Sequence, residues 1–192
     1  SLAKEVIYGM YADTAERGQP QVPCQNEDGT TNMECMDNNT AGTPPSWGGP
    51  LFTVHSILAR DGNKEWGAKM YPLLKSYLRF WLTNRTDSDG YQICKCSWES
   101  GQDMMKRWGW NQSYGGDRST RIIRAPEHQA AMAHAAGVMG ALAQELGLGS
   151  AAEAYCASVR DRHVNLTLSL WHAEAKWFCD YNSEAGAWQS GC

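Results

Sequence analysis

Trp98-Glu99-Ser100-Gly101-Gln102-Asp103 is the most informative stretch of this 192-residue sequence. Glu99 and Asp103 stand four residues apart, so a helical turn would place both carboxylates on one face. Two carboxylates this close raise each other's pKa, and desolvation by the neighbouring tryptophans acts in the same direction. A carboxylic acid that stays protonated near neutral pH can give its proton to the leaving oxygen of a glycosidic bond. The alternative is an exposed acidic turn beside core tryptophans.

Five helices are predicted outward from this stretch by hydrophobic periodicity and end signals, over residues 2–17, 50–60, 64–84, 126–146 and 150–170. Pro72 must either kink the third helix or mark the first turn of its main body. The alanine-rich fourth helix implies close packing against a neighbour, and Gly147 suits its C-cap. The last helix opens with Ser150-Ala151-Ala152-Glu153, which is interpreted as a capping box.

Extended segments are expected at two places. Residues 91–97 alternate apolar and polar side chains, which predicts a short strand or extended segment leading to Trp98. Residues 171–188 are interpreted as one β-hairpin, with a strand at 177–181 and a turn at 184–186.

Two long loops are also expected. The polar residues 19–49 form a surface loop that is interpreted as stapled by disulfides. The Gly-rich, basic residues 109–124 are either a substrate loop, in which Trp110 or Tyr114 stacks on a sugar, or an ordinary mobile loop.

No metal site and no cofactor are predicted. The Asp-rich residues 84–90 are too short for an EF-hand loop and lack its distal Glu, so a polar turn is the better interpretation. His128 and His134 are six residues apart, which is a poor spacing for one helical face. We therefore expect each histidine to be hydrogen-bonded singly. Glu127 is either a second carboxylate near the site or an N-terminal charge favoured by the helix dipole.

Cysteines and glycosylation sequons favour an oxidising compartment. Disulfides are the preferred interpretation of the seven cysteines, Cys24, Cys35, Cys94, Cys96, Cys156, Cys179 and Cys192. Their spacing does not fit zinc, and the odd number leaves one thiol without an intrachain partner. Four N-x-S/T sequons lie at Asn38, Asn84, Asn111 and Asn165. Together they predict a secreted or secretory-lumen glycoprotein, against the alternative of a cytosolic protein with accidental sequons.

The overall charge excludes some classes of partner. The formal net charge is −4, and no basic stripe occurs, so nucleic acid is not expected as a partner. No run of about 20 apolar residues occurs, so no membrane span is expected.

The motif resembles the general-acid segment of glycoside hydrolase family 63, which includes processing α-glucosidases, and the trehalases carry a similar segment. Further stretches fit that family in the same order between residues 43 and 188: Thr43-Pro44-Pro45-Ser46-Trp47, Met70-Tyr71-Pro72, Phe80-Trp81-Leu82-Thr83-Asn84-Arg85 and Leu170-Trp171 through Phe178-Cys179-Asp180-Tyr181-Asn182. The resemblance implies a mainly α fold, about half of an (α/α)6 toroid of antiparallel helix pairs with a short β-hairpin near the C-terminus. Residues 1–192 would be a single segment of that catalytic domain.

The resemblance also implies roles for single residues. Asp103 matches the general acid, Glu99 would orient a sugar hydroxyl or tune Asp103, and Arg107 would pair with a carboxylate or hydroxyl. The predicted substrate-binding residues are Trp47, Trp98, Glu99, Arg107, Trp108 and Trp110. The family's general base lies further downstream, so we expect it on a further polypeptide segment or chain that completes the toroid.

The predicted function is inverting hydrolysis of α-glucosidic bonds in oligosaccharides or glycans by an incomplete chain. A non-catalytic carbohydrate-binding or structural secreted glycoprotein on the same scaffold is the first alternative, and a trehalase-like enzyme is the second. Gln102 and Met104-Met105-Lys106 depart from the usual residues of the family, which leaves the fine substrate specificity open.

Overall fold

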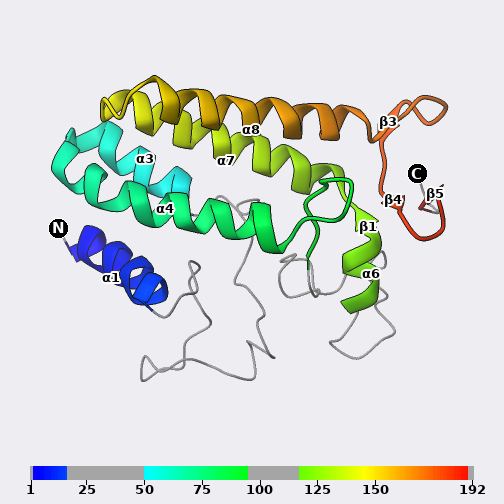
Figure 1. Cartoon of the computed structure of the whole chain (residues 1–192), viewed down its shortest axis with the longest axis horizontal. Helices are drawn as coiled ribbons and strands as arrows, with labels where there is room; N and C mark the ends of the chain where they lie inside the picture. The colour runs from blue at the N-terminus through cyan, green and yellow to red at the C-terminus, as the bar shows by residue number, and fades with distance from the viewer. Residues whose placement is uncertain (1, 17–49, 95–116, 190–192) are drawn as a thin grey trace.

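A computed structural model describes residues 2–16, 50–94 and 117–189, and helices dominate it (Figure 1). The helices are α1 (Leu2–Glu16), α3 (Pro50–Asp61), α4 (Lys64–Asn84), α6 (Asp117–Ile122), α7 (Pro126–Glu145) and α8 (Ser150–Leu168). The strands are β1 (Ile123–Arg124), β2 (Trp171–His172), β3 (Trp177–Phe178), β4 (Tyr181–Asn182) and β5 (Ala187–Trp188). The mainly α class expected from the sequence is confirmed.

Two antiparallel helix pairs, α3–α4 and α7–α8, pack against each other to form the core (Figure 1). Short turns connect the members of each pair, which forces them to run in opposite directions. Helix α1 packs on α4 at the edge of this layer. In the part of the chain that the structure describes, no helix is both long and apolar enough to cross a membrane.

Helix α4 is determined by local signals that the sequence shows clearly. Its N-cap residue Asn63 accepts a hydrogen bond from the backbone N–H of Trp66 at 3.0 Å. Met70, Leu74 and Trp81 recur with the helical period and are fully buried. Pro72 lies inside the helix, which continues to Asn84. The apolar stripe therefore overrides the helix-breaking tendency of the proline.

Helix α7 supplies the close packing that its small residues predict. A β-carbon at Gly140 would lie 3.3 Å from Cβ of Cys156, so the absence of a side chain lets α8 approach. The helix ends at Glu145 with Leu146 as its C-cap residue, and Gly147, the predicted C-cap, is the next residue, with φ +67°. The N–H of Leu148 donates to the carbonyl of Ala143 at 2.9 Å, as in a Schellman motif.

The capping box predicted at the start of α8 is wrong. Gly149, with φ +91°, is the N-cap residue, and no side chain caps the helix. The backbone N–H groups of Ala152 and Glu153 both donate to the carbonyl of Gly149. Ser150 is therefore the first helical residue, one position too late to act as the cap.

The strands form two hairpins rather than the single hairpin that was predicted. Strand β2 pairs with β3, whereas β4 pairs with both β5 and β1 in a three-stranded sheet. The two turns repeat each other: Lys176 (φ +52°) and Gly186 (φ +63°) occupy the same turn position. His172 Nδ1 accepts an N–H in the first turn, as Asn182 Oδ1 does in the second. The predicted strand 177–181 spans the end of one hairpin and the start of the next.

The strand predicted at 91–97 is reduced, among described residues, to an isolated bridge between Thr86 and Gln92.

Cys94 and Cys156 are buried thiols, so the prediction of disulfides is wrong for these two cysteines. Cys179 is buried and disulfide-bonded. The pairing of the cysteines stays a prediction, since Cys24, Cys35, Cys96 and Cys192 lie outside the described residues, as does the loop 19–49.

Candidate functional site

The predicted acid and the predicted substrate-binding residues, Trp47, Trp98, Glu99, Asp103, Arg107, Trp108 and Trp110, lie outside the described residues. The structure instead describes the residues on both sides of 95–116. Cys94, the last described residue before that stretch, is fully buried, and its Sγ lies 3.8 Å from Nδ1 of His128. On the other side, α6 and β1 lead directly into Pro126 of α7. Both flanks therefore meet at the N-terminal end of α7 (Figure 1).

The first flank is fixed to α7 by the side chain of Gln129, which is fully buried. Gln129 Oε1 accepts the backbone N–H of Gln92 at 2.9 Å. Its Nε2 donates to the backbone carbonyl of the same residue at 2.8 Å. The amide thus satisfies both backbone groups of Gln92, as a neighbouring strand would.

The second flank is fixed by an ion cluster around Arg124 of β1. Arg124 Nε donates to Asp87 Oδ2 at 2.7 Å, and its Nη2 donates to Asp89 Oδ2 at 2.5 Å. Burial opposes the charge of Arg124, but the hydrogen bonds to Asp89 and Asp87 outweigh it and raise its pKa. The guanidinium lies 4.3 Å from the ring centroid of Tyr91 and 5.9 Å from that of Tyr181.

The same two aspartates belong to the segment that the sequence predicts to be a polar turn, and that prediction is confirmed. Asp87 Oδ1 accepts the backbone N–H groups of Asp89 and Tyr91, both at 2.9 Å. Gly90 has φ +93°, and a β-carbon there would collide with the guanidinium of Arg162 on α8. The carboxylates of Asp87 and Asp89 are bound by a cation of the protein itself, the guanidinium of Arg124. Among the described residues, no group of three His, Cys, Asp or Glu could hold a metal ion.

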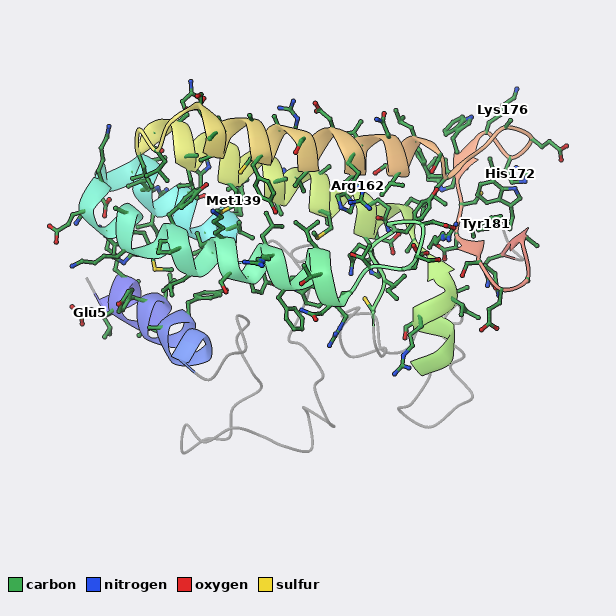
Figure 2. All side chains as sticks on the ribbon, viewed as in Figure 1. Glu5, Met139, Arg162, His172, Lys176 and Tyr181 are labelled. Carbon is green, nitrogen blue, oxygen red and sulfur yellow. The ribbon has the colours of Figure 1, made fainter. Side chains whose placement is uncertain are left out.

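The paired hairpins extend this end of the molecule with aromatic side chains. The rings of Tyr181 and His172 lie 5.3 Å and 4.9 Å from that of Trp188. Trp171 and Trp177 are 46% and 71% exposed. Figure 2 shows His172 and Tyr181 on this side, with Lys176 at the outer turn. The first hairpin therefore presents exposed rings, and the second brings Tyr181 to Arg124.

The two histidines considered as a metal pair have different neighbours. His128 is buried against Cys94, and His134 lies beside Phe52 with ring centroids 6.3 Å apart. Nothing in the sequence singled out His163 of α8, which is 1% exposed and whose two ring nitrogens have no hydrogen-bond partner among the described residues. Burial and the charge of Arg162 lower the pKa of His163 to about 4. It is neutral at physiological pH.

Two predicted sequons fall on described residues. Asn84 and Asn165 are both exposed, the first at the end of α4 and the second on α8. Asn38 and Asn111 lie outside the described residues. Exposure is necessary for glycosylation but does not test it, so modification of these residues stays a prediction.

A family model described as the mannosylglycerate hydrolase MGH1-like glycoside hydrolase domain matches residues 13–191. No functionally curated protein matches the chain. Three solved structures from Thermus thermophilus share its fold. A GH63 mannosylglycerate hydrolase in complex with glucose has a TM-score of 0.62 at 19% identity, with 78% of this chain and 44% of that chain covered.

The same hydrolase in complex with Tris and D-glycerate has a TM-score of 0.66 at 16% identity, with 89% of this chain and 55% of that chain covered. An uncharacterized conserved protein has a TM-score of 0.66 at 18% identity, with 89% of this chain and 52% of that chain covered. At these identities the likeness is one of fold. The chain spans about half the length of these proteins, which confirms the expected fold of about half a toroid.

Proposed function

The chain belongs to the family of mannosylglycerate hydrolase MGH1-like glycoside hydrolase domains, and we propose that it contributes the general-acid side of a glycosidase site. The resemblance to glycoside hydrolase family 63 is confirmed by this family and by the names of the solved structures. The observation that carries the proposal is the position of the acid motif. It lies within the matched residues, between two flanks that are both fixed at the N-terminal end of α7.

In the proposed mechanism, Asp103 gives its proton to the leaving oxygen while water attacks the anomeric carbon from the opposite face. Glu99 orients a sugar hydroxyl or tunes Asp103, and Arg107 pairs with a carboxylate or hydroxyl of the substrate. The indoles of Trp47, Trp98, Trp108 and Trp110 supply apolar surface for sugar faces.

An inverting reaction also needs a base about 6.5 to 9.5 Å from the acid, with room for the attacking water. We place this base on a further segment or chain that completes the toroid. Two observations support that placement. The chain spans about half of its structural relatives, and it exposes large apolar side chains such as Leu168 (58%) and Trp177 (71%).

The proposed substrates are α-glucosides of oligosaccharides or glycans. Small α-glycosides of glycerate are a second candidate class, because a structural relative is named a mannosylglycerate hydrolase and is bound to D-glycerate.

We also propose that the protein is secreted and N-glycosylated. The exposure of Asn84 and Asn165 supports this proposal, and the mass lost on enzymatic removal of N-glycans from the native protein tests it.

The test compares wild-type protein with Asp103→Asn on two kinds of α-glucoside, each protein being assayed in the native assembly. The variant should lose about 10²-fold or more in kcat on a disaccharide, because its leaving oxygen needs a proton. It should lose far less on α-glucosyl fluoride, whose leaving group departs without one. Asp161→Asn, which removes an exposed carboxylate on α8, is the matched control and should keep wild-type rates. Equal losses on both substrates would contradict the role of Asp103 as the acid, and sugar binding without turnover in the wild type would favour the non-catalytic alternative.

A further inference from the structure

The Arg124 cluster connects three parts of the chain that are far apart in sequence. The acid-bearing stretch is residues 95–116, which contain Asp103. Asp87, Asp89 and Tyr91 precede this stretch, Arg124 follows it, and Tyr181 belongs to the second hairpin. Strand β1 also pairs with β4, so that Arg124 lies opposite Tyr181. The cluster therefore ties the entrance and the exit of the acid-bearing stretch to each other and to the hairpins.

The geometry of the cluster requires a guanidinium. Two different nitrogens of Arg124 reach carboxylates of two different aspartates, while its central carbon Cζ lies over the ring of Tyr91 at 4.3 Å from the centroid. An ammonium group is a point donor on a flexible stem and cannot reproduce this planar fork. The side chains of Arg124 and Asp87 are only 12% and 13% exposed, so solvent screens this pair weakly.

We propose that Arg124 is a positioning residue that holds the two ends of the acid-bearing stretch in the register that catalysis needs. This inference rests on the proposed glycosidase function. Arg124 acts through the backbone of its own strand and of the turn 87–91, and it takes no part in proton transfer. A displacement of the acid of about 1 Å is enough to lower turnover by about 10²-fold.

The test measures kcat, KM and the pH dependence of kcat/KM for Arg124→Ala and Arg124→Lys. Both variants should lose about 10- to 100-fold in kcat with KM within threefold of wild type, because the positioning of the acid is altered rather than the binding of sugar. The basic limb of the pH profile should move in both variants, since the pKa of the acid depends on the groups held around it. Added guanidinium ion at millimolar concentration should restore part of the kcat of Arg124→Ala and none of that of Arg124→Lys.

Two further variants keep the test decisive. Asp89→Asn removes the more exposed partner and should give a smaller loss of kcat in a stably folded protein. Arg160→Ala removes an exposed arginine that pairs with its neighbour Asp161 and should behave as wild type. Wild-type kcat and an unmoved pH profile in Arg124→Ala, with Asp103→Asn inactive, would overturn the positioning role alone. Full turnover in Asp103→Asn would overturn the proposed function, and with it this inference.

Discussion

The side-chain amide of Gln129 makes two hydrogen bonds to the backbone of Gln92, one as acceptor at 2.9 Å and one as donor at 2.8 Å. Through this pair the first turn of α7 takes the place of a β-strand beside the segment that leads to the acid motif. The contact is fully buried, so neither backbone group of Gln92 has water as a substitute.

Gln129→Ala should therefore lower the free energy of unfolding by about 2 to 4 kcal/mol, since it leaves two buried backbone groups without their partner. Urea denaturation measures this change. Gln144→Ala replaces an exposed glutamine on the same helix and should stay within about 0.5 kcal/mol of wild type. A loss below about 1 kcal/mol for Gln129→Ala would mean that Gln92 does not depend on this amide.

His163 predicts a pH-dependent stability. Its pKa is about 4 in the folded protein, against 6.5 as the ordinary value, so the unfolded chain binds more protons between these pH values. The free energy of unfolding should fall as pH decreases from 6.5 towards 4, by at most about 1.4 kcal/mol per pH unit from this residue. His163→Leu should remove this slope. Denaturant midpoints at several pH values measure the effect, and parallel curves for the two proteins would contradict it.

Two glycines of α7 make a matched pair. A β-carbon at Gly137 would lie 3.9 Å from Arg160 Cδ, which is an ordinary contact, whereas one at Gly140 would lie 3.3 Å from Cys156 Cβ. Gly137→Ala should stabilise the protein by about 0.5 to 1 kcal/mol through helix propensity. Gly140→Ala should lose that gain because α8 must shift. Thermal unfolding of both variants checks the difference, and equal stabilisation would show that the α7–α8 contact is less tight.

The repeated turns predict opposite effects from two substitutions. Lys176 has φ +52° without being a glycine, so Lys176→Gly should raise the free energy of unfolding by about 1 kcal/mol. Gly186 has φ +63°, so Gly186→Ala should lower it by a similar amount. Denaturant titration followed by tryptophan fluorescence would report both. Changes of the same sign would show that the two turns are not equivalent.

Local signals explain what the sequence predicted well. The predicted bounds of α4 match the structure, because its two signals are local. The N-cap residue Asn63 directly precedes the helix, and the buried apolar stripe lies within it. Gly147 was predicted as the C-cap of α7 and lies one residue after the C-cap residue Leu146, at a left-handed φ that glycine adopts without strain.

Long-range pairing explains most of what the sequence did not predict. Arg124 and Asp87 are 37 residues apart, and no periodicity links them. The hairpins have strands of two residues, which are too short to show alternation, so the turns alone could have revealed them. Among described cysteines, Cys94 and Cys156 differ from the prediction because cysteine number and compartment do not determine which cysteines form disulfides.

The candidate site follows a different pattern. The motif at 98–103 pointed to a glycosidase family, which the family model confirms, while the roles of its residues remain proposals. Arg124 was assigned to the predicted loop 109–124, of which residues 117–124 form α6 and β1, and the anchoring roles of Arg124 and Gln129 were not predicted because each acts on a segment far away along the chain.

The most direct test of the central claim is the ratio of kcat for Asp103→Asn to kcat for wild type on an unactivated α-glucoside, measured on the native assembly. The expected ratio is about 0.01 or less, because the departing sugar oxygen then has no proton donor. A ratio near one would contradict it.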